Sequence, residues 1–327
     1  MKRIVLFDTS IGSHNKGDEV IMEAVERELR PVYEREYVYR FPTHTVAFPF
    51  GHQFTSKSAK ACHDADYKFI CGTNLFWTNM KHPNPLLNVN LLNCKPLENS
   101  ILFGVGYDEE QCKGRFDLYA RTLWKRVLSK EYIHSVRDDR TVEYLNSIGL
   151  KAVNTGCPTL WKLTPEHCAQ IPTGKAENVV FTLSSTGGEH RENNQKIIDM
   201  LLKNYREVYF YCQTYEDYLK LKLYEQFERI KIIDSSIARY KTFLQENDVD
   251  YVGTRLHGGI YAMQQKCRAI ILSVDNRAVE FDKYHINCMN QYDIRGIEEK
   301  INSDFQTNVT VDYDRVNMWL QQFLPTE

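Results

Sequence analysis

The feature that most limits how this chain can fold is a repeated alternation of two kinds of segment. Short runs rich in β-branched and aromatic residues are followed by stretches with helical periodicity. Such alternation is typical of β-α-β units and predicts an α/β fold with a mainly parallel sheet. In the first half of the chain we expect strands at 3–8, 36–40, 67–71, 100–104, 132–136 and 151–154, and helices at 18–30, 57–64, 116–129 and 139–147.

The alternation stops at residues 155–177, where glycines and prolines favour an irregular linker, and then begins again. A last helix at about 313–323 is expected to pack back on the first half of the chain. In the second half the expected strands are 178–184, 207–211, 230–233, 249–252 and 268–272, and the expected helices are 192–203, 215–227, 238–246 and 257–266.

Two of the helices carry sequence signals for their ends. Asp18 is placed to cap the first helix, ahead of an apolar stripe that runs from Val20 to Leu29. Asp138 or Asp139 is placed to cap the helix at 139–147, and Gly149 is placed to end it.

Two successive alternations of similar size predict two Rossmann-like domains with mainly parallel sheets facing a central cleft, the arrangement known as GT-B. The expected N-terminal domain is 1–157, on the acceptor side, and 158–176 is the linker. The expected C-terminal domain is 177–327, on the donor side. Ligands of such folds bind beyond the carboxyl ends of the strands.

Composition excludes several classes of protein. Hydrophobic residues make up 43% and charged residues 26% of the 327 residues, as in globular chains. The formal net charge of -2 provides no broad basic field, so nucleic acid is not expected as a partner. No apolar run approaches the roughly 20 residues that a membrane-spanning helix needs.

The cysteines indicate a reducing compartment. There are nine of them, without regular spacing or a C-x-x-C pair, which argues against a disulfide framework and against a zinc site. Cys71 and Cys267 stand in or beside apolar runs and are expected to be buried. We therefore expect a cytoplasmic protein.

The strongest candidate for chemistry is the segment 252–262, which leads from a strand into a helix. Arg255 and His257 are two residues apart in an extended entry, so both side chains can face one ligand. Gly258 and Gly259 permit close approach of the backbone, and a helix N-terminus favours an anion. The alternative is an arginine that bonds a carbonyl and a histidine that is satisfied in the core.

Two further segments have the same strand-to-helix context. Arg137, in the segment 135–141, is suited to grip a phosphate or a carboxylate, unless it pairs with a neighbouring aspartate at the surface. The loop 11–18 is polar and contains glycine, but it matches neither a dinucleotide motif nor a P-loop. Asn15, Lys16 and Asp18 are expected to face the cleft, with helix capping as the alternative for Asp18.

Two loops are weaker candidates for contacts with an acceptor or a phosphate group. One is 71–74, which contributes Thr73 and Asn74, and the other is 184–188, which contributes Ser185 and Thr186. In the loop 11–18, Asn15 and Gly17 have the same candidate role. Either of the two weaker loops is a simple turn in the alternative interpretation.

The order of these motifs resembles that of the polysaccharide pyruvyl transferase family, over about residues 3–290. The likeness is carried by Asn15-x-Gly17-Asp18, by Val136-Arg137-Asp138, and by Arg255-Leu256-His257-Gly258 with Ala262. The chain departs from the family pattern at 71–74, where a glycine-rich loop is usual, and at 156–159, where Asp-Pro-Ala is common.

The resemblance implies a reaction and a role for each matching residue. Arg255 and Arg137 would bind the anionic donor phosphoenolpyruvate, together with Leu256 and Gly258. His257 would be the catalytic imidazole. Asp18 is a candidate for the group that deprotonates the acceptor.

We therefore expect a transferase that moves a pyruvyl group from phosphoenolpyruvate to a sugar of a cell-surface polysaccharide, or of its lipid-linked precursor, forming a pyruvate ketal. No cofactor and no metal are expected. The expected location is the cytoplasm, either free or peripherally at the inner face of the membrane. The alternatives are a GT-B glycosyltransferase that uses a nucleotide sugar and a catalytically inactive glycan-binding relative.

Overall fold

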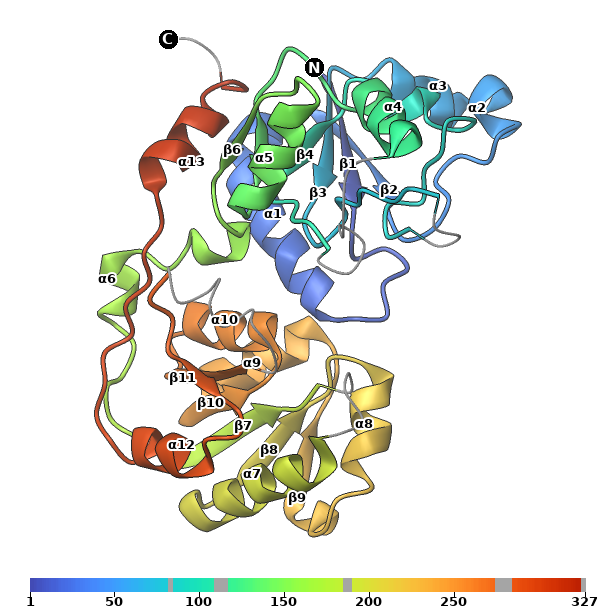
Figure 1. Ribbon diagram of the computed structural model, residues 1–327. Helices are drawn as coiled ribbons and strands as arrows, with labels where there is room; N and C mark the ends of the chain where they lie inside the picture. Colours follow the sequence, from blue (N-terminus) through green and yellow to red (C-terminus); the bar gives the residue numbers. More distant parts are fainter. Residues whose placement is uncertain (82–84, 109–116, 185–189, 274–283, 325–327) are drawn as a thin grey trace. The chain divides into compact units, whose positions relative to one another are not determined.

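The structure is a computed structural model that describes residues 1–81, 85–108, 117–184, 190–273 and 284–324. The chain divides into two compact units, which are drawn in Figure 1. The first unit comprises residues 1–13, 21–158 and 312–327. The second comprises residues 14–20 and 159–311.

The first unit is built on a parallel sheet with the strand order β2-β1-β3-β4. Gly104 N–H donates to the Ser135 carbonyl at 3.0 Å and Val105 bridges Val136, so the parallel pair β5-β6 continues beside β4. The strands are β1 (Arg3–Asp8), β2 (Tyr37–Pro42), β3 (Tyr67–Cys71), β4 (Ile101–Phe103), β5 (His134–Val136) and β6 (Ala152–Asn154).

The helices of this unit follow the expected apolar stripes and caps. On α1 the stripe from Val20 to Leu29 is buried. The carboxylate of Asp138 accepts from Thr141 N–H at 2.7 Å and caps α5, while Gly149, with φ +80°, ends it. The helices are α1 (Gly17–Tyr33), α2 (His52–Thr55), α3 (Lys57–His63), η1 (Lys95–Leu97), α4 (Leu118–Val127), α5 (Asp139–Ser147) and α13 (Tyr313–Leu320).

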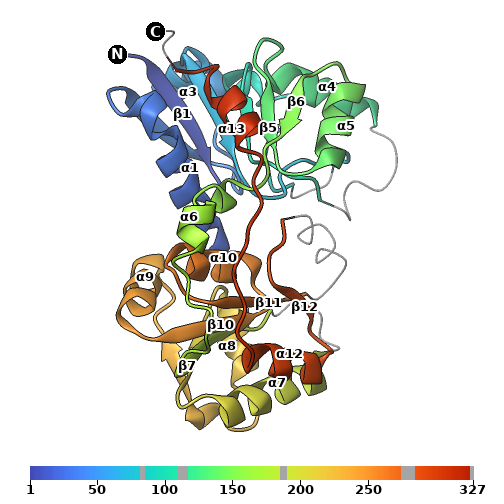
Figure 2. The ribbon, with the colours of Figure 1, turned by 90° about the vertical axis from the view of Figure 1, so that its left-hand side faces the viewer.

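The last helix, α13, packs on the sheet of the first unit although it lies at the end of the chain. Trp319 is fully buried, stacks on Phe103 with ring centroids 4.6 Å apart, and donates from Nε1 to the Ile133 carbonyl at 2.8 Å. Figure 2 shows α13 beside β5 and β6. The C-terminal segment therefore completes the core of the N-terminal unit.

The second unit contains a parallel sheet of six strands in the order β12-β11-β10-β7-β8-β9. Successive strands run outward from β7 to β9, and the chain then returns to the other side of β7. The order thus reverses between β7 and β10, where open α/β sheets bind ligands. The strands are β7 (Asn178–Thr182), β8 (Val208–Tyr211), β9 (Ile230–Ile233), β10 (Val249–Gly253), β11 (Ala269–Ser273) and β12 (Cys288–Asn290).

Helices cover both faces of this sheet (Figure 1). On one face, Tyr240 of α9 stacks on Tyr211 of β8 with ring centroids 3.8 Å apart, and Tyr261 of α10 stacks on Tyr240. On the other face, α7, α8 and α12 share one apolar core with the strands. The helices are η2 (Pro158–Leu160), α6 (Pro165–Cys168), α7 (Arg191–Asn204), α8 (Tyr215–Leu221), η4 (Phe227–Arg229), α9 (Ile237–Glu246), α10 (Leu256–Gln264) and α12 (Ile294–Ile301).

These two α/β units confirm the predicted fold class, and the expected strands and long helices are found with small shifts at their ends. Cys71 and Cys267 are buried, as expected. The predicted helix 215–227 is wrong in length, because it ends at Leu221 and Gln226 has a φ of +58° that no α-helix accommodates. The expected capping role of Asp18 is also wrong, since α1 begins at Gly17 and includes Asp18 in its first turn.

Several short elements were not anticipated, among them α2 and η1. The stretch 155–177 was expected to be an irregular linker, but it contains the short helices η2 and α6. Strand β12 and helix α12 were missed altogether. The sequence did contain a signal for α12, because Asp293 caps it and its buried residues Ile297 and Ile301 are four apart.

Candidate active site

The loop that follows β10 is fixed where the strand order reverses. Thr254 N–H donates to the Thr182 carbonyl at 3.0 Å, and Arg255 N–H donates to Thr182 Oγ1 at 3.1 Å. Ser184 N–H in turn donates to Thr254 Oγ1 at 2.6 Å. These bonds join the ends of β7 and β10 and place Arg255 at the N-cap position of α10.

The guanidinium of Arg255 is held by a buried carboxylate. Its Nε and Nη2 lie 3.1 and 2.5 Å from the two carboxylate oxygens of Asp217, whose side chain is 0% exposed against 14% for Arg255. Nη2 also lies 3.4 Å from Thr214 Oγ1. A two-point contact of this kind fixes both the position and the plane of the guanidinium.

Asp217 is itself fixed by the start of α8. Thr214 N–H donates to the Asp217 carboxylate at 3.2 Å, and Asp217 N–H donates to Thr214 Oγ1 at 3.1 Å, which completes a capping box. Sequence reasoning missed Asp217 as a functional residue. The available signal was a Thr-x-x-Asp pattern directly after a predicted strand, at the same sheet edge as Arg255.

One edge of the guanidinium remains for a ligand. Asp217 occupies the edge formed by Nε and Nη2, and no residue in the described ranges bonds Nη1. Arg255 does not cap α10 with its side chain; its carbonyl accepts from the Tyr251 hydroxyl at 2.7 Å. The arginine therefore combines a fixed orientation with a donor edge at a helix N-terminus, which suits an anion.

A second helix N-terminus lies beside the first within the same unit. Residues 14–20, which include the first turn of α1, belong to the second unit. Lys16 N–H donates to the Gln213 carbonyl at 2.9 Å, and a Cβ added to Gly17 would lie 3.4 Å from His257 Nδ1. The imidazole of His257 thus lies at the meeting point of the first turns of α1 and α10.

The predicted residues of this region occupy different positions around that meeting point. Asn15 accepts from Gly17 N–H at 2.9 Å through its side chain and so shapes the entry to α1. Asp18 is 6% exposed in the first turn. Leu256 and Gly258 lie in the first turn of α10, and a Cβ on Gly258 would come 2.9 Å from Gln213 Nε2.

The thiol of Cys212, which directly precedes Gln213, is not suited to nucleophilic chemistry. Burial, and then the charge of Asp217, raise the pKa of Cys212 to about 12. A thiol with such a pKa stays protonated at neutral pH. Of the catalytic candidates from the sequence, this region contains the imidazole of His257 and the carboxylate of Asp18.

The predicted residues of the first unit form a separate group at the carboxyl ends of β3 and β5. Arg137 Nη2 donates to Asn74 Oδ1, and Gly106 N–H donates to the Thr73 carbonyl at 2.9 Å. Burial raises the pKa of Asp138, and hydrogen bonds from Thr141 oppose that shift. The structure therefore brings Arg137, Thr73 and Asn74 together within this unit. Ser185 and Thr186 lie outside the described residues.

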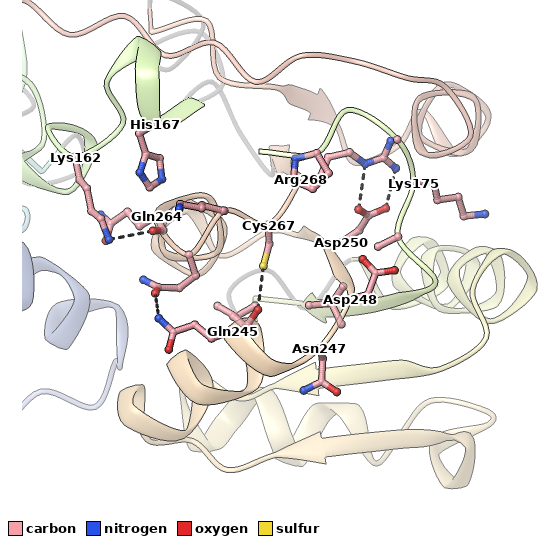
Figure 3. A pocket seen from close by; sticks show the side chains of 17 residues that line it. Lys162, His167, Lys175, Gln245, Asn247, Asp248, Asp250, Gln264, Cys267 and Arg268 are labelled. Atoms are coloured by element: carbon pink, nitrogen blue, oxygen red, sulfur yellow. Dashed lines mark hydrogen bonds and ion pairs between the residues drawn. The ribbon is translucent and has the colours of Figure 1, made fainter. Parts of the chain in front are cut away.

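A cavity of about 690 Å³ opens at the other end of the second sheet (Figure 3). Several of its polar groups bond one another or the backbone: Arg268 pairs with Asp250 at 2.7 Å, Lys162 Nζ donates to the Gln264 carbonyl at 3.0 Å, and His167 Nε2 lies 2.9 Å from the Met263 carbonyl. Because it lies at the amino ends of β10 and β11, this cavity is not the candidate active site.

Two kinds of feature are absent from the described residues. They contain no group of three or more His, Cys, Asp or Glu side chains arranged to hold a metal ion. Within the same ranges, none of the helices has the length and apolarity needed to span a bilayer.

Solved structures with a similar fold come from sugar-nucleotide enzymes. Two structures of UDP-GlcNAc 2-epimerase from Methanocaldococcus jannaschii, one in complex with UDP-GlcNAc and UDP, align with TM-scores of 0.55 and 0.56 at 12% and 13% identity. Both alignments cover 98% of this chain and 100% of the epimerase. S. aureus MnaA with UDP aligns over the whole of both chains, with a TM-score of 0.53 and 11% identity. At these identities the likeness establishes the fold, which is GT-B-like.

The comparison of sequences identifies a family, which the likeness of fold does not. No curated protein matches the chain significantly. A family model described as polysaccharide pyruvyl transferase matches residues 15–276, from the loop before α1 to beyond β11. The match spans most of the chain and includes Arg137, Arg255 and His257, and the protein therefore belongs to the polysaccharide pyruvyl transferase family.

Proposed function

We propose that this protein transfers a pyruvyl group from phosphoenolpyruvate to a sugar of a cell-surface polysaccharide, or of its lipid-linked precursor, and forms a pyruvate ketal. Members of this family are transferases, and the family implies a saccharide acceptor. The observation that carries the choice of donor is the position of His257, between two helix N-termini and next to an arginine with one uncommitted edge.

Phosphoenolpyruvate suits such a site because it has two anionic groups, a carboxylate and a phosphate. The first turn of α10 offers backbone N–H groups to an anion, and the dipoles of α1 and α10 both favour one there. Nη1 of Arg255 supplies a charged donor in a fixed plane. Arg137 is proposed as a second ligand of the donor, from its place in the family motif.

The reaction needs a proton at the methylene carbon of the donor. His257 is proposed to deliver it, which gives C2 cationic character and converts the methylene into the methyl group of the product. One sugar hydroxyl attacks C2, with Asp18 as the proposed base. Phosphate leaves, and a second hydroxyl adds to C2 to close the ketal. One of the two hydroxyl protons replaces the proton that His257 donates, and the other leaves with the phosphate, so the products are the ketal and inorganic phosphate.

Release of inorganic phosphate from phosphoenolpyruvate tests the proposal. Purified protein is incubated with the donor and, in separate reactions, with candidate sugars and lipid-linked saccharides. We expect release that depends on one class of saccharide, together with a product heavier by the mass of a pyruvate ketal. Turnover of a nucleotide sugar under the same conditions, without turnover of phosphoenolpyruvate, would instead establish the glycosyltransferase alternative.

A further inference from the structure

A second cavity in the C-terminal unit adjoins the candidate active site. Its volume is about 380 Å³, within the roughly 300–1,000 Å³ usual for small-molecule sites. It opens at the carboxyl ends of β8 and β9, the ligand-binding edge of a parallel sheet. Its lining includes Lys16, Gln213, Thr214, Tyr215, Tyr218 and Ile232.

The cavity shares residues with the surroundings of Arg255 and His257. Lys16 and Gln213 line it, and the hydrogen bond between their backbones joins the start of α1 to the end of β8. Thr214 also lines it, and Thr214 Oγ1 lies 3.4 Å from Arg255 Nη2. A ligand in the cavity would therefore be adjacent to a donor bound at Arg255.

The lining has aromatic and apolar surface that the described chain leaves uncovered. Tyr215 is 68% exposed and Ile232 is 43% exposed. The Tyr215 and Tyr218 rings lie on α8 with their centroids 6.2 Å apart. An open tyrosine face of this kind packs against the C–H face of a sugar ring, while its hydroxyl stays at the polar rim.

Polar groups at the same cavity suit sugar hydroxyls. Gln213 is 2% exposed, and its Nε2 has no hydrogen-bond partner among the residues that the structure describes. An unbonded buried amide is costly, so a small shift of the Gln213 side chain that let a ligand complete the bonding of Nε2 would gain free energy. Asp234 and Ser235, directly after β9, add a carboxylate and a hydroxyl at the rim.

We propose that this cavity is the acceptor subsite and holds a saccharide ring against Tyr215. The inference rests on the proposed function, because the sugar that accepts the pyruvyl group has to lie beside the arginine that is proposed to bind the donor. It places acceptor recognition within the C-terminal unit, on α8 and the ends of β8 and β9, next to the start of α1. The sequence had instead favoured the N-terminal domain as the acceptor side.

Saturation-transfer NMR on the full chain tests the assignment without turnover. The probes are methyl glycosides of galactose, glucose, mannose and N-acetylglucosamine, with uridine as a nucleoside probe. The variants are Tyr215→Ala, Tyr215→Phe and the control Tyr292→Ala, which removes a 52% exposed tyrosine that does not line the cavity. We expect one glycoside to bind the wild type, about tenfold weaker binding in Tyr215→Ala, and near-normal binding in Tyr215→Phe and Tyr292→Ala.

Three results would overturn the assignment: no glycoside binds the wild type, binding is unchanged in Tyr215→Ala, or only uridine depends on Tyr215. The test of the subsite can succeed or fail independently of the test of pyruvyl transfer. Glycoside binding that requires Tyr215 supports the subsite even if phosphoenolpyruvate is never turned over. Conversely, phosphate release with an acceptor KM that is unchanged in Tyr215→Ala removes the subsite and leaves the pyruvyl transfer in place.

Discussion

Arg255 and Asp217 form a pair that the chain brings together from two helices, across 38 residues of sequence. The carboxylate is fully buried and the guanidinium nearly so. Removing one member of a buried pair leaves the other charge uncompensated, which is strongly unfavourable. At the scale of the residue, Asp217 therefore orients Arg255 without contacting the edge of the guanidinium that is proposed to bind phosphoenolpyruvate.

The first prediction concerns Asp217→Asn. The variant keeps the volume of the side chain but removes its charge, so Arg255 loses its fixed plane. We expect weaker binding of phosphoenolpyruvate by calorimetry and a loss of about 3 kcal/mol in the free energy of unfolding. Glu299→Gln is the matched control, because its pair with Arg295 is exposed. Donor affinity equal to that of the wild type would show that Asp217 does not position Arg255.

The second prediction concerns His257→Gln. Glutamine can donate a hydrogen bond but cannot release a proton to carbon. Turnover with phosphoenolpyruvate should fall by about 10²–10⁴, the usual effect of losing a general acid, while donor affinity changes much less. Comparison of kcat with a calorimetric Kd separates the two effects. Near-normal kcat in this variant would assign the acid to another group.

At the scale of the element, the site depends on how closely α10 approaches the sheet beneath it. A Cβ on Gly259 would lie 2.7 Å from the Tyr251 ring and 2.9 Å from Ile271 Cγ1. Tyr251 in turn bonds the carbonyl of Arg255 at 2.7 Å. Glycine in this turn therefore sets the depth at which the first turn of α10, and with it His257, rests on β10 and β11.

The third prediction follows from the close packing of α10 on the sheet at Gly259. Gly259→Ala should destabilise the protein by about 1–3 kcal/mol, the usual cost of overpacking a core, and should reduce donor affinity as α10 shifts. Denaturant unfolding measures the first effect. Gly51→Ala is the control, since a Cβ there meets no atom within 4 Å. Equal stability of the two variants would show that α10 can move away without cost.

The sequence predicted those parts of the fold that depend on local pattern. Strands β1 and β9 and helix α5 were placed with the correct bounds because their periodicity and caps lie within one segment. Strand β12 has only three residues, which is too short for a period, and it exists through its pairing with β11.

The residues of the candidate site that the sequence did not reveal are brought there by the tertiary fold. The motif of Arg255 and His257 was visible because both residues lie in one strand-to-helix turn. Asp217 and Gln213 reach that turn only because β8 and β10 lie on either side of β7. The contact of Lys16 with Gln213 likewise requires the first turn of α1 to belong to the second unit, which no local pattern indicates.

At the scale of the whole molecule, stability depends on pH through a buried histidine in the first unit. His134 is 0% exposed; its Nδ1 accepts from Leu102 N–H at 3.1 Å and its Nε2 lies 3.0 Å from the Ser129 carbonyl. Burial lowers the pKa of His134 from 6.5 to about 4. The imidazole is therefore neutral in the folded protein at pH 7 and joins β4 to the chain before β5.

The fourth prediction gives the sign of that dependence. Because the pKa of His134 is lower in the folded state, the unfolded chain binds its proton first as the pH falls. Stability should be lost between about pH 6.5 and pH 4, by about 3 kcal/mol from this group, and should be fully present above pH 6.5. Denaturant unfolding at pH 7 and pH 5 measures the loss. A His134→Gln variant should lose less over the same interval, and an equal loss in both proteins would contradict the assignment.

The central claim is that Arg255 holds phosphoenolpyruvate for pyruvyl transfer, and a calorimetric titration of that donor tests it most directly. The titration compares the wild type, Arg255→Ala and the control Arg295→Ala, whose side chain is 90% exposed. We expect the wild type and Arg295→Ala to bind alike and Arg255→Ala to lose about 2–5 kcal/mol of binding free energy. A wild type that does not bind phosphoenolpyruvate, or an Arg255→Ala variant that binds it equally well, would contradict the account.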